Sequence, residues 1–271
     1  MSVSGGDRSQ WADLRPRVLS AVAMVAVGAL AIWAGGAAIA ALVILVCGLM
    51  IWELALMTGA GGGAGTRVIS VALAVFAGLC LLVVAAVETR LVLILLVLPA
   101  GVGALLARRE PGIYAAYAVL VMLTGYGLIS LRADPGLAVI LWLVLVVVAS
   151  DVLGYFAGRT LGGPKFWPRV SPKKTWSGTV AGWFGAALVG LGFVLAGQGG
   201  WGLVWLSPLV ALAGQMGDIA ESWIKRQVGV KDSSALIPGH GGVMDRFDAL
   251  AGAVVVVFVL SLLAPLPIGG N

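Results

Sequence analysis

Long apolar segments alternate with short polar ones along almost the whole chain. A helix needs about 20 apolar residues to cross the hydrocarbon core of a bilayer. Segments of about this length lie at 18–34, 37–57, 68–87, 90–107, 113–131, 136–156, 177–196, 202–223 and 243–265. The pattern predicts an all-α polytopic membrane protein with about nine transmembrane helices. The fourth segment is short, which favours a tilted or partly re-entrant course.

Polar segments divide the chain into one membrane domain and two tails. Residues 1–17 are polar and carry both signs of charge, so they are interpreted as a cytoplasmic tail and not as a signal peptide. Residues 18–265 form a single transmembrane domain, and 266–271 form a short C-terminal tail. The stretch Gly59–Gly65 lacks the Lys-Ser/Thr ending of a phosphate-binding P-loop, so it is interpreted as a flexible connector.

Positive charges select the orientation of these spans. Of the 17 Lys and Arg residues, all but Arg90 and Arg132 fall in segments that a nine-span chain with its N-terminus inside places in the cytoplasm. Cytoplasmic loops of membrane proteins carry such an excess. We therefore expect a cytoplasmic N-terminus, an outside C-terminus and two cytoplasmic loops, near 157–176 and 224–242.

Composition supports a bilayer location and excludes several other classes. Hydrophobic residues make up 61% of the chain and charged residues 11%, against about a quarter charged in soluble domains. The net charge of +5 is attributed to topology and anionic substrates, and no nucleic acid is expected as a partner. Cys47 and Cys80 lie in separate apolar runs, which excludes a disulfide framework and a thiolate zinc site.

Ionisable side chains are concentrated in the second half of the chain. In the first half, Glu53 and Glu88 lie close to span ends, where water is expected to reach them. A charge at the centre of a membrane helix costs about 2.5–3.5 kcal/mol, so such groups usually face a polar cavity. The second half carries acids in or at the ends of its spans: Asp151, Asp218, Glu221, Asp245 and Asp248. The alternative is that these acids only pair with the nearby cations Lys225, Arg226 and Arg246.

The spacing of these residues indicates a phosphate-handling site. Asp218, Ser222 and Lys225 recur at i, i+4 and i+7, which places them on one helix stripe. Asp245 and Asp248 are three residues apart and share a helix face as well. Carboxylates suit Mg²⁺, whereas cations and glycine amides suit phosphates. The combination is typical of phosphoryl or nucleotidyl transfer.

The two predicted cytoplasmic loops add candidate phosphate ligands. The cluster Ser171–Thr175 (SPKKT) combines hydroxyls with two lysines, and the alternative is that its charges serve only topology and attraction to acidic lipid. In the second loop, His240 lies between two glycines, so it is interpreted as a phosphate contact and not as a general base.

At this point the sequence resembles the phosphatidate cytidylyltransferase family. The run Ser222–Asp248, SWIKRQVGVKDSSALIPGHGGVMDRFD, meets every fixed position of the family signature S-x-x-K-R-x4-K-D-x4-[LIF]-[PG]-x-H-G-G-x-x-D-R-x-D. Two upstream blocks agree with the family, Gly214–Ser222 (GQMGDIAES) and Val170–Gly178 (VSPKKTWSG). The chain departs from the family in having Ser177 where Glu is usual and Gly154 where Ala is usual.

The resemblance implies that CTP and phosphatidic acid react to CDP-diacylglycerol and diphosphate, in a step that supplies phospholipid biosynthesis. It implies an active site mainly within 151–248, with Mg²⁺, a monovalent cation such as K⁺, a homodimer and a bacterial inner membrane whose cytoplasmic side faces the site. The metal-binding acids would be Asp218 and Asp245. The catalytic residues would be Asp218, Lys225, Asp245 and Asp248. The substrate-binding residues would be Ser171, Lys173, Thr175, Arg226, Lys231, Asp232, His240 and Arg246.

Three other functions would use some of the same residues or features. A CTP-dependent kinase of a lipid alcohol would use similar parts, but the full signature disfavours it. A secondary transporter with an acidic ion site is disfavoured because no inverted repeat is seen and the acids cluster at one end. A CDP-alcohol phosphotransferase would need the motif D-G-x2-A-R, which the chain lacks.

Overall fold

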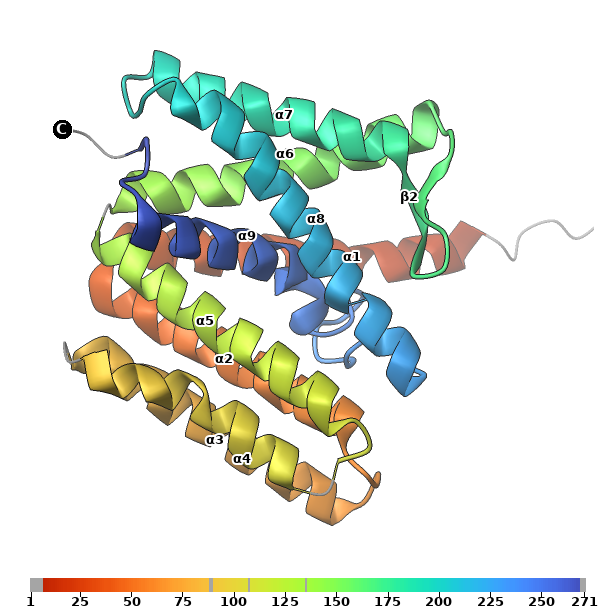
Figure 1. The fold of residues 1–271 in the computed structure, drawn as a ribbon. Helices are drawn as coiled ribbons and strands as arrows, with labels where there is room; N and C mark the ends of the chain where they lie inside the picture. Colours follow the sequence, from red (N-terminus) through yellow and green to blue (C-terminus); the bar gives the residue numbers. More distant parts are fainter. Residues whose placement is uncertain (1–6, 88–89, 107, 135, 269–271) are drawn as a thin grey trace, which may run out of the picture.

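The structure is a computed structural model that describes residues 7–87, 90–106, 108–134 and 136–268, and it is almost entirely helical (Figure 1). An all-α membrane protein is therefore confirmed. Within the described residues, eight helices are long and apolar enough to cross a membrane: α1 (Asp7–Ala34), α2 (Gly36–Thr58), α3 (Ala64–Ala86), α5 (Pro111–Ala133), α6 (Leu137–Thr160), α7 (Trp176–Leu195), α8 (Gly202–Val228) and α9 (Met244–Leu263). Helix α1 begins inside the segment predicted as a polar tail.

The fourth predicted span is not one continuous α-helix. It consists of a 3₁₀ helix, η1 (Arg90–Leu96), and a short α-helix, α4 (Leu98–Leu105). Pro99 lies in the first turn of α4, where its missing N–H interrupts the hydrogen bonding of a longer helix. Seven 3₁₀ residues and eight α-helical residues rise about 26 Å together. Arg108 then pairs with Gly59, so the segment returns to the end of the bundle where α3 begins.

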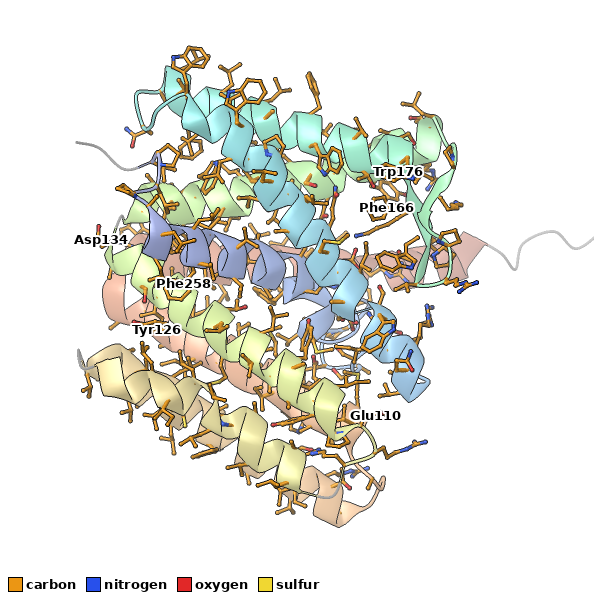
Figure 2. All side chains as sticks on the ribbon, in the orientation of Figure 1. Glu110, Tyr126, Asp134, Phe166, Trp176 and Phe258 are labelled. Atoms are coloured by element: carbon orange, nitrogen blue, oxygen red, sulfur yellow. The ribbon has the colours of Figure 1, made fainter. Side chains whose placement is uncertain are left out.

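The helices form two groups that meet on α9. Helices α2 to α5 pack together on one side, and α6, α7 and α8 pack together on the other (Figure 1). Helix α9 lies between the groups and contacts α2, α5, α6 and α8. The rings of Tyr126 in α5 and Phe258 in α9 meet edge to face, with centroids 5.4 Å apart (Figure 2). Helix α9 therefore holds the two halves of the chain together.

Apolar side chains cover the outside of the bundle as well as its core. Trp33, Trp201 and Trp205 lie near helix ends and are strongly exposed, as expected for side chains that face lipid and its interface. Cys47 and Cys80 are buried free thiols that pack within this core.

The loop between α6 and α7 folds into a β-hairpin, which the sequence analysis did not predict. Strands β1 (Lys165–Trp167) and β2 (Ser171–Thr175) pair antiparallel. The rings of Phe166 and Trp176 meet with centroids 4.7 Å apart (Figure 2). The hydroxyl of Ser177, at the position where the family usually has Glu, donates to the Gly162 carbonyl and lies 3.0 Å from the Thr175 hydroxyl. Ser177 therefore closes the base of the hairpin.

Candidate active site

Helices α8 and α9 cross so closely that only glycine fits at the contact. A Cβ on Gly217 would collide with the backbone oxygen of Asp248, and a Cβ on Gly252 would collide with the backbone oxygen of Ala213. Small residues allow such close approach of membrane helices. The crossing brings Asp218, the neighbour of Gly217, next to Asp248 on the facing helix.

Three carboxylates gather at this crossing and form what we call the acidic cluster. One oxygen each from Asp218, Glu221 and Asp248 lies within 4.8 Å of the other two. Glu221 is 1% exposed and Asp248 is 8% exposed. Glu221 Oε1 is buried and has no hydrogen-bond partner among the described residues, which is costly unless a cation or water meets it.

The acidic cluster fits a hard divalent cation. Mg²⁺ binds oxygens at about 2.1 Å in octahedral geometry, so neighbouring ligands are about 3.0 Å apart and opposite ligands about 4.2 Å apart. The three carboxylate oxygens lie within 4.8 Å of one another, and binding of the ion would draw them closer together. Three neighbouring carboxylates repel one another, which a bound cation would offset.

Lys225 is the cation that links the acidic cluster to α9. Its Nζ lies 2.6 Å from Glu221 Oε2 and 2.6 Å from Asp245 Oδ1. The predicted stripe on α8 is present, since the Ser222 hydroxyl donates to Asp218 Oδ1 over 3.3 Å. Glu221 and Asp245 are therefore paired with Lys225, as in the alternative in which these acids only pair with nearby cations. Asp248, by contrast, forms no ion pair within the described residues.

Asp245 is hydrogen-bonded to the loop that precedes α9. Besides Lys225, it accepts hydrogen bonds from the backbone N–H groups of Gly242, over 2.7 Å, and Ser233, over 3.0 Å. Asp245 does not belong to the acidic cluster. The family resemblance implies Asp218 and Asp245 as the metal-binding acids, and the carboxylates that lie nearest to Asp218 in this cluster are Glu221 and Asp248.

The hairpin reaches the acidic cluster through Lys174. Its Nζ lies 2.5 Å from Asp218 Oδ2 and donates to the Gln215 carbonyl over 3.3 Å. Lys173, which the sequence predicts as a substrate ligand, is exposed. Ser171 is half-buried, and Thr175 is buried where its hydroxyl accepts from the Gly178 N–H and caps α7.

The other predicted substrate ligands surround the loop between α8 and α9. His240 is half-buried, and its Nδ1 lies 2.8 Å from the Ser20 hydroxyl of α1. Arg246 donates from Nε to the His240 carbonyl over 2.9 Å. The remaining three, Arg226, Lys231 and Asp232, are exposed. These polar groups line the same end of the bundle as the acidic cluster.

Glu53 lies in surroundings that differ from those predicted from the sequence. It was expected near water, but it is 0% exposed. Its carboxylate accepts four hydrogen bonds, three from the segment between α8 and α9 and one from Met244, the first residue of α9. Asp151 of α6, by contrast, is exposed, within electrostatic reach of Lys174 and Asp218. The sequence does contain an indication that Glu53 has a specific role, because a carboxylate within an apolar helix is rare and usually has polar partners.

An apolar pocket lies on another face of α8. Its volume is about 320 Å³. It is lined by Trp167, Val170, Met216, Ile219, Ala220 and Trp223. The hairpin therefore has a polar contact with the acidic cluster, through Lys174, and an apolar contact with this pocket.

Comparison with known proteins now assigns the chain to a family. The family described as the cytidylyltransferase family matches residues 15–264. The chain belongs to the cytidylyltransferase family. The match covers the scaffold helices as well as the acidic cluster, so the family relationship applies to the whole bundle.

Similar proteins from three bacteria carry the name phosphatidate cytidylyltransferase. The protein from Brucella abortus is 34% identical over 254 residues, which cover 91% of this chain and 93% of that protein. The Helicobacter pylori protein is 44% identical over 128 residues, 46% of this chain and 47% of that protein. The Staphylococcus aureus protein is 41% identical over 133 residues, 48% of this chain and 49% of that protein.

Proposed function

We propose that this membrane protein is a phosphatidate cytidylyltransferase, which converts CTP and phosphatidic acid to CDP-diacylglycerol and diphosphate for phospholipid biosynthesis. The observation that carries this proposal is the similarity to proteins of that name along 91% of the chain. The acidic cluster, with Lys174 and Lys225 against it, supplies the charges that such a transfer needs.

Asp218, Glu221 and Asp248 are the residues that would hold Mg²⁺. A bound Mg²⁺ would polarise phosphate oxygens and offset the charge of the diphosphate. Asp245, implied as a metal ligand by the family resemblance, would instead hold Lys225 and the loop in place. We also propose that a monovalent cation such as K⁺, which the resemblance implies, binds beside the Mg²⁺.

The reaction exchanges one phosphorus–oxygen bond for another. A phosphate oxygen of phosphatidic acid bonds to the α-phosphorus of CTP, and the bond to the β-phosphate oxygen breaks, so that diphosphate leaves with the electron pair. The nucleophile is already anionic near neutral pH, so no strong general base is needed. Lys174 and Lys225 would offset the repulsion between the two anions. His240, Arg246 and the exposed loop cations would bind the phosphates of CTP.

Both substrates would reach the site at one end of the bundle. CTP would enter from the cytoplasm over the hairpin and the loop before α9. Phosphatidic acid would approach from the bilayer with an acyl chain against the apolar pocket, whose Trp167 and Trp223 are half-exposed. The proposal places the protein in a bacterial inner membrane, with this end facing the cytoplasm.

Purified protein, phosphatidic acid, Mg²⁺ and CTP labelled in the α-phosphate test the reaction. Label should enter a CDP-lipid, and unlabelled diphosphate should be released in equal amount. With γ-labelled CTP the lipid should stay unlabelled. A γ-labelled lipid would overturn the proposal and establish a kinase.

Cysteine labelling and mass measurement test the orientation and assembly. A cysteine at Ala235 should react only from the cytoplasmic side, and one at Gln198 only from outside, since both positions are exposed. Labelling of both from one side would contradict the orientation. The family resemblance also implies a homodimer, so light scattering of the purified protein should give twice the mass of one 27.6 kDa chain, after subtraction of detergent.

A further inference from the structure

Glu53 is a buried carboxylate outside the acidic cluster. It lies in the apolar helix α2, is 0% exposed and has no ion pair among the residues that the structure describes. A buried, unpaired carboxylate is strongly destabilising unless several donors satisfy its oxygens. The contacts of Glu53 therefore indicate why it is placed there.

The donors to Glu53 all come from the segment that carries the active-site loop. Glu53 Oε1 accepts from the Ser234 hydroxyl over 2.6 Å and from the Val243 N–H over 2.8 Å. Oε2 accepts from the Ser233 hydroxyl over 3.0 Å and from the Met244 N–H over 2.7 Å. Each oxygen thus accepts hydrogen bonds from one serine hydroxyl and one backbone amide.

These two amides belong to the N-terminus of α9, which has no side-chain cap of its own. The first N–H groups of a helix have no partner within the helix, and this end carries partial positive charge. Glu53 supplies both the acceptor and the negative charge from another helix. Gly242 makes this contact possible, because a Cβ there would collide with Ser233 Oγ and Glu53 Oε1.

Ser233 extends the network from Glu53 to the catalytic groups. Its hydroxyl lies 3.0 Å from Glu53 Oε2 and 3.0 Å from Asp245 Oδ2, so the two carboxylates share its single proton. Asp245 binds Lys225, and Lys225 binds Glu221 of the acidic cluster. A continuous series of polar contacts therefore runs from α2, through the loop and α9, to α8.

We propose that Glu53 is a positioning residue for the nucleotidyl transfer. It fixes the start of α9 and the Ser233 hydroxyl, and through them it sets the position of Asp245 and Lys225 beside the acidic cluster. The effect on catalysis rests on the proposed function, whereas the placement of the loop by Glu53 does not depend on which reaction the protein catalyses. Groups that orient ligands and charges in this way typically contribute about 10–100-fold to activity.

The first test replaces Glu53 by Gln. The amide keeps the shape, but its NH₂ group cannot accept, so one backbone amide of α9 and one serine hydroxyl lose their acceptor. We expect kcat per folded enzyme to fall about tenfold or more, with KM for CTP changed less than about threefold. The matched control is Glu110→Gln at the exposed start of α5, whose side chain forms no cap (Figure 2). A kcat within twofold of wild type for Glu53→Gln overturns the proposal.

The second test compares the two serines that bind Glu53. Both Ser233→Ala and Ser234→Ala remove one hydroxyl donor to Glu53, but only Ser233 also reaches Asp245. Positioning of Asp245 predicts a larger loss of kcat for Ser233→Ala. An equal loss would assign Glu53 a capping role alone and overturn the positioning role.

Hydrogen exchange of the same proteins separates this proposal from the proposed function. In Glu53→Gln, exchange should accelerate in the peptide covering 232–245 and stay unchanged in α3 and α7. Unchanged exchange in that peptide overturns the positioning role, whatever reaction the enzyme catalyses. Wild-type protein that forms no CDP-diacylglycerol overturns the proposed function, even where the exchange result agrees.

Discussion

The two halves of the chain differ in what their buried residues do. Helices α2, α3 and α5 bury apolar side chains such as Met50, Leu81 and Met122, and they contribute one buried carboxylate, Glu53. Helices α8 and α9 bury Glu221 and Asp248 at a glycine-mediated crossing. The first half therefore serves mainly as an apolar scaffold, whereas the second half shields charged groups from lipid at one helix crossing.

Of all the changes considered, removal of a charge from the acidic cluster should reduce enzyme activity most. Asp218→Asn and Asp248→Asn keep the side-chain shape but remove the negative charge that would hold Mg²⁺. We expect CDP-diacylglycerol synthesis to fall by more than about 100-fold, and the double variant to be scarcely worse than either single one. The measurement is turnover at saturating Mg²⁺, with folding checked by gel filtration.

Asp134→Asn is the matched control for these variants. Asp134 is exposed just after α5, at the other end of that helix from Glu110 (Figure 2). Its turnover should equal that of wild type. Near-normal turnover of Asp218→Asn or Asp248→Asn would remove the metal assignment.

The hairpin provides the second test, because its two lysines point in different directions. Lys174→Ala should lower kcat/KM about 10–100-fold, as expected for loss of a charged contact worth about 1.5–3 kcal/mol. Lys173→Ala should chiefly raise KM for CTP, since this side chain is exposed. Arg159→Ala, at the end of α6, is the control for loss of one positive charge. If Lys173 proved more important than Lys174, the contact with Asp218 would not be the functional one.

The metal requirement distinguishes the acidic cluster from Asp245. Glu221→Gln should raise the Mg²⁺ concentration for half-maximal activity by about tenfold, because one charged ligand is lost. Asp245→Asn should lower kcat while leaving that concentration within about twofold, since its carboxylate is bound to Lys225 and the loop. Treatment with a chelator should abolish the activity of wild type, and added Mg²⁺ should restore it. The reverse pattern for the two variants would return the metal site to Asp218 and Asp245.

The smallest effect on catalysis is expected in the scaffold. Leu81→Ala removes a side chain of α3 that is 1% exposed. In soluble proteins such a change costs about 2–5 kcal/mol. The cost should be smaller here, because a separated helix would still bury Leu81 in lipid and only the cavity contributes. We expect a lower melting temperature and an unchanged kcat per folded enzyme. A large loss of kcat would show that the first half takes part in the chemistry beyond Glu53.

Hydropathy predicted the helices well, because each span must be apolar along its whole length. Its short length marked the fourth span as irregular, but hydropathy did not predict the division into η1 and α4, which keep the composition of a span but not its hydrogen bonding. The hairpin was also missed. Strands of three and five residues within a loop leave little periodic signal.

The candidate site was only partly predictable for a different reason. Helical spacing placed Asp218 and Lys225 on one stripe of α8, and the structure agrees with that arrangement. Spacing within one element cannot show contacts between elements. The contact of Lys174 with Asp218 could not be predicted, because Asp218 lies on another helix. The expectation of water around Glu53 was wrong for the same reason, because its donors lie outside α2.

The capping of α9 by Glu53 also constrains the order in which the protein can mature. Val243 follows Glu53 by 190 residues. At about 5–20 residues per second of synthesis, roughly 10–40 s pass between the two. During this interval the carboxylate of α2 resides in the membrane without its native donors. A nascent chain that has inserted the seven long helices before α9 therefore still lacks Asp248 and the two backbone donors to Glu53, and insertion of α9 supplies all three.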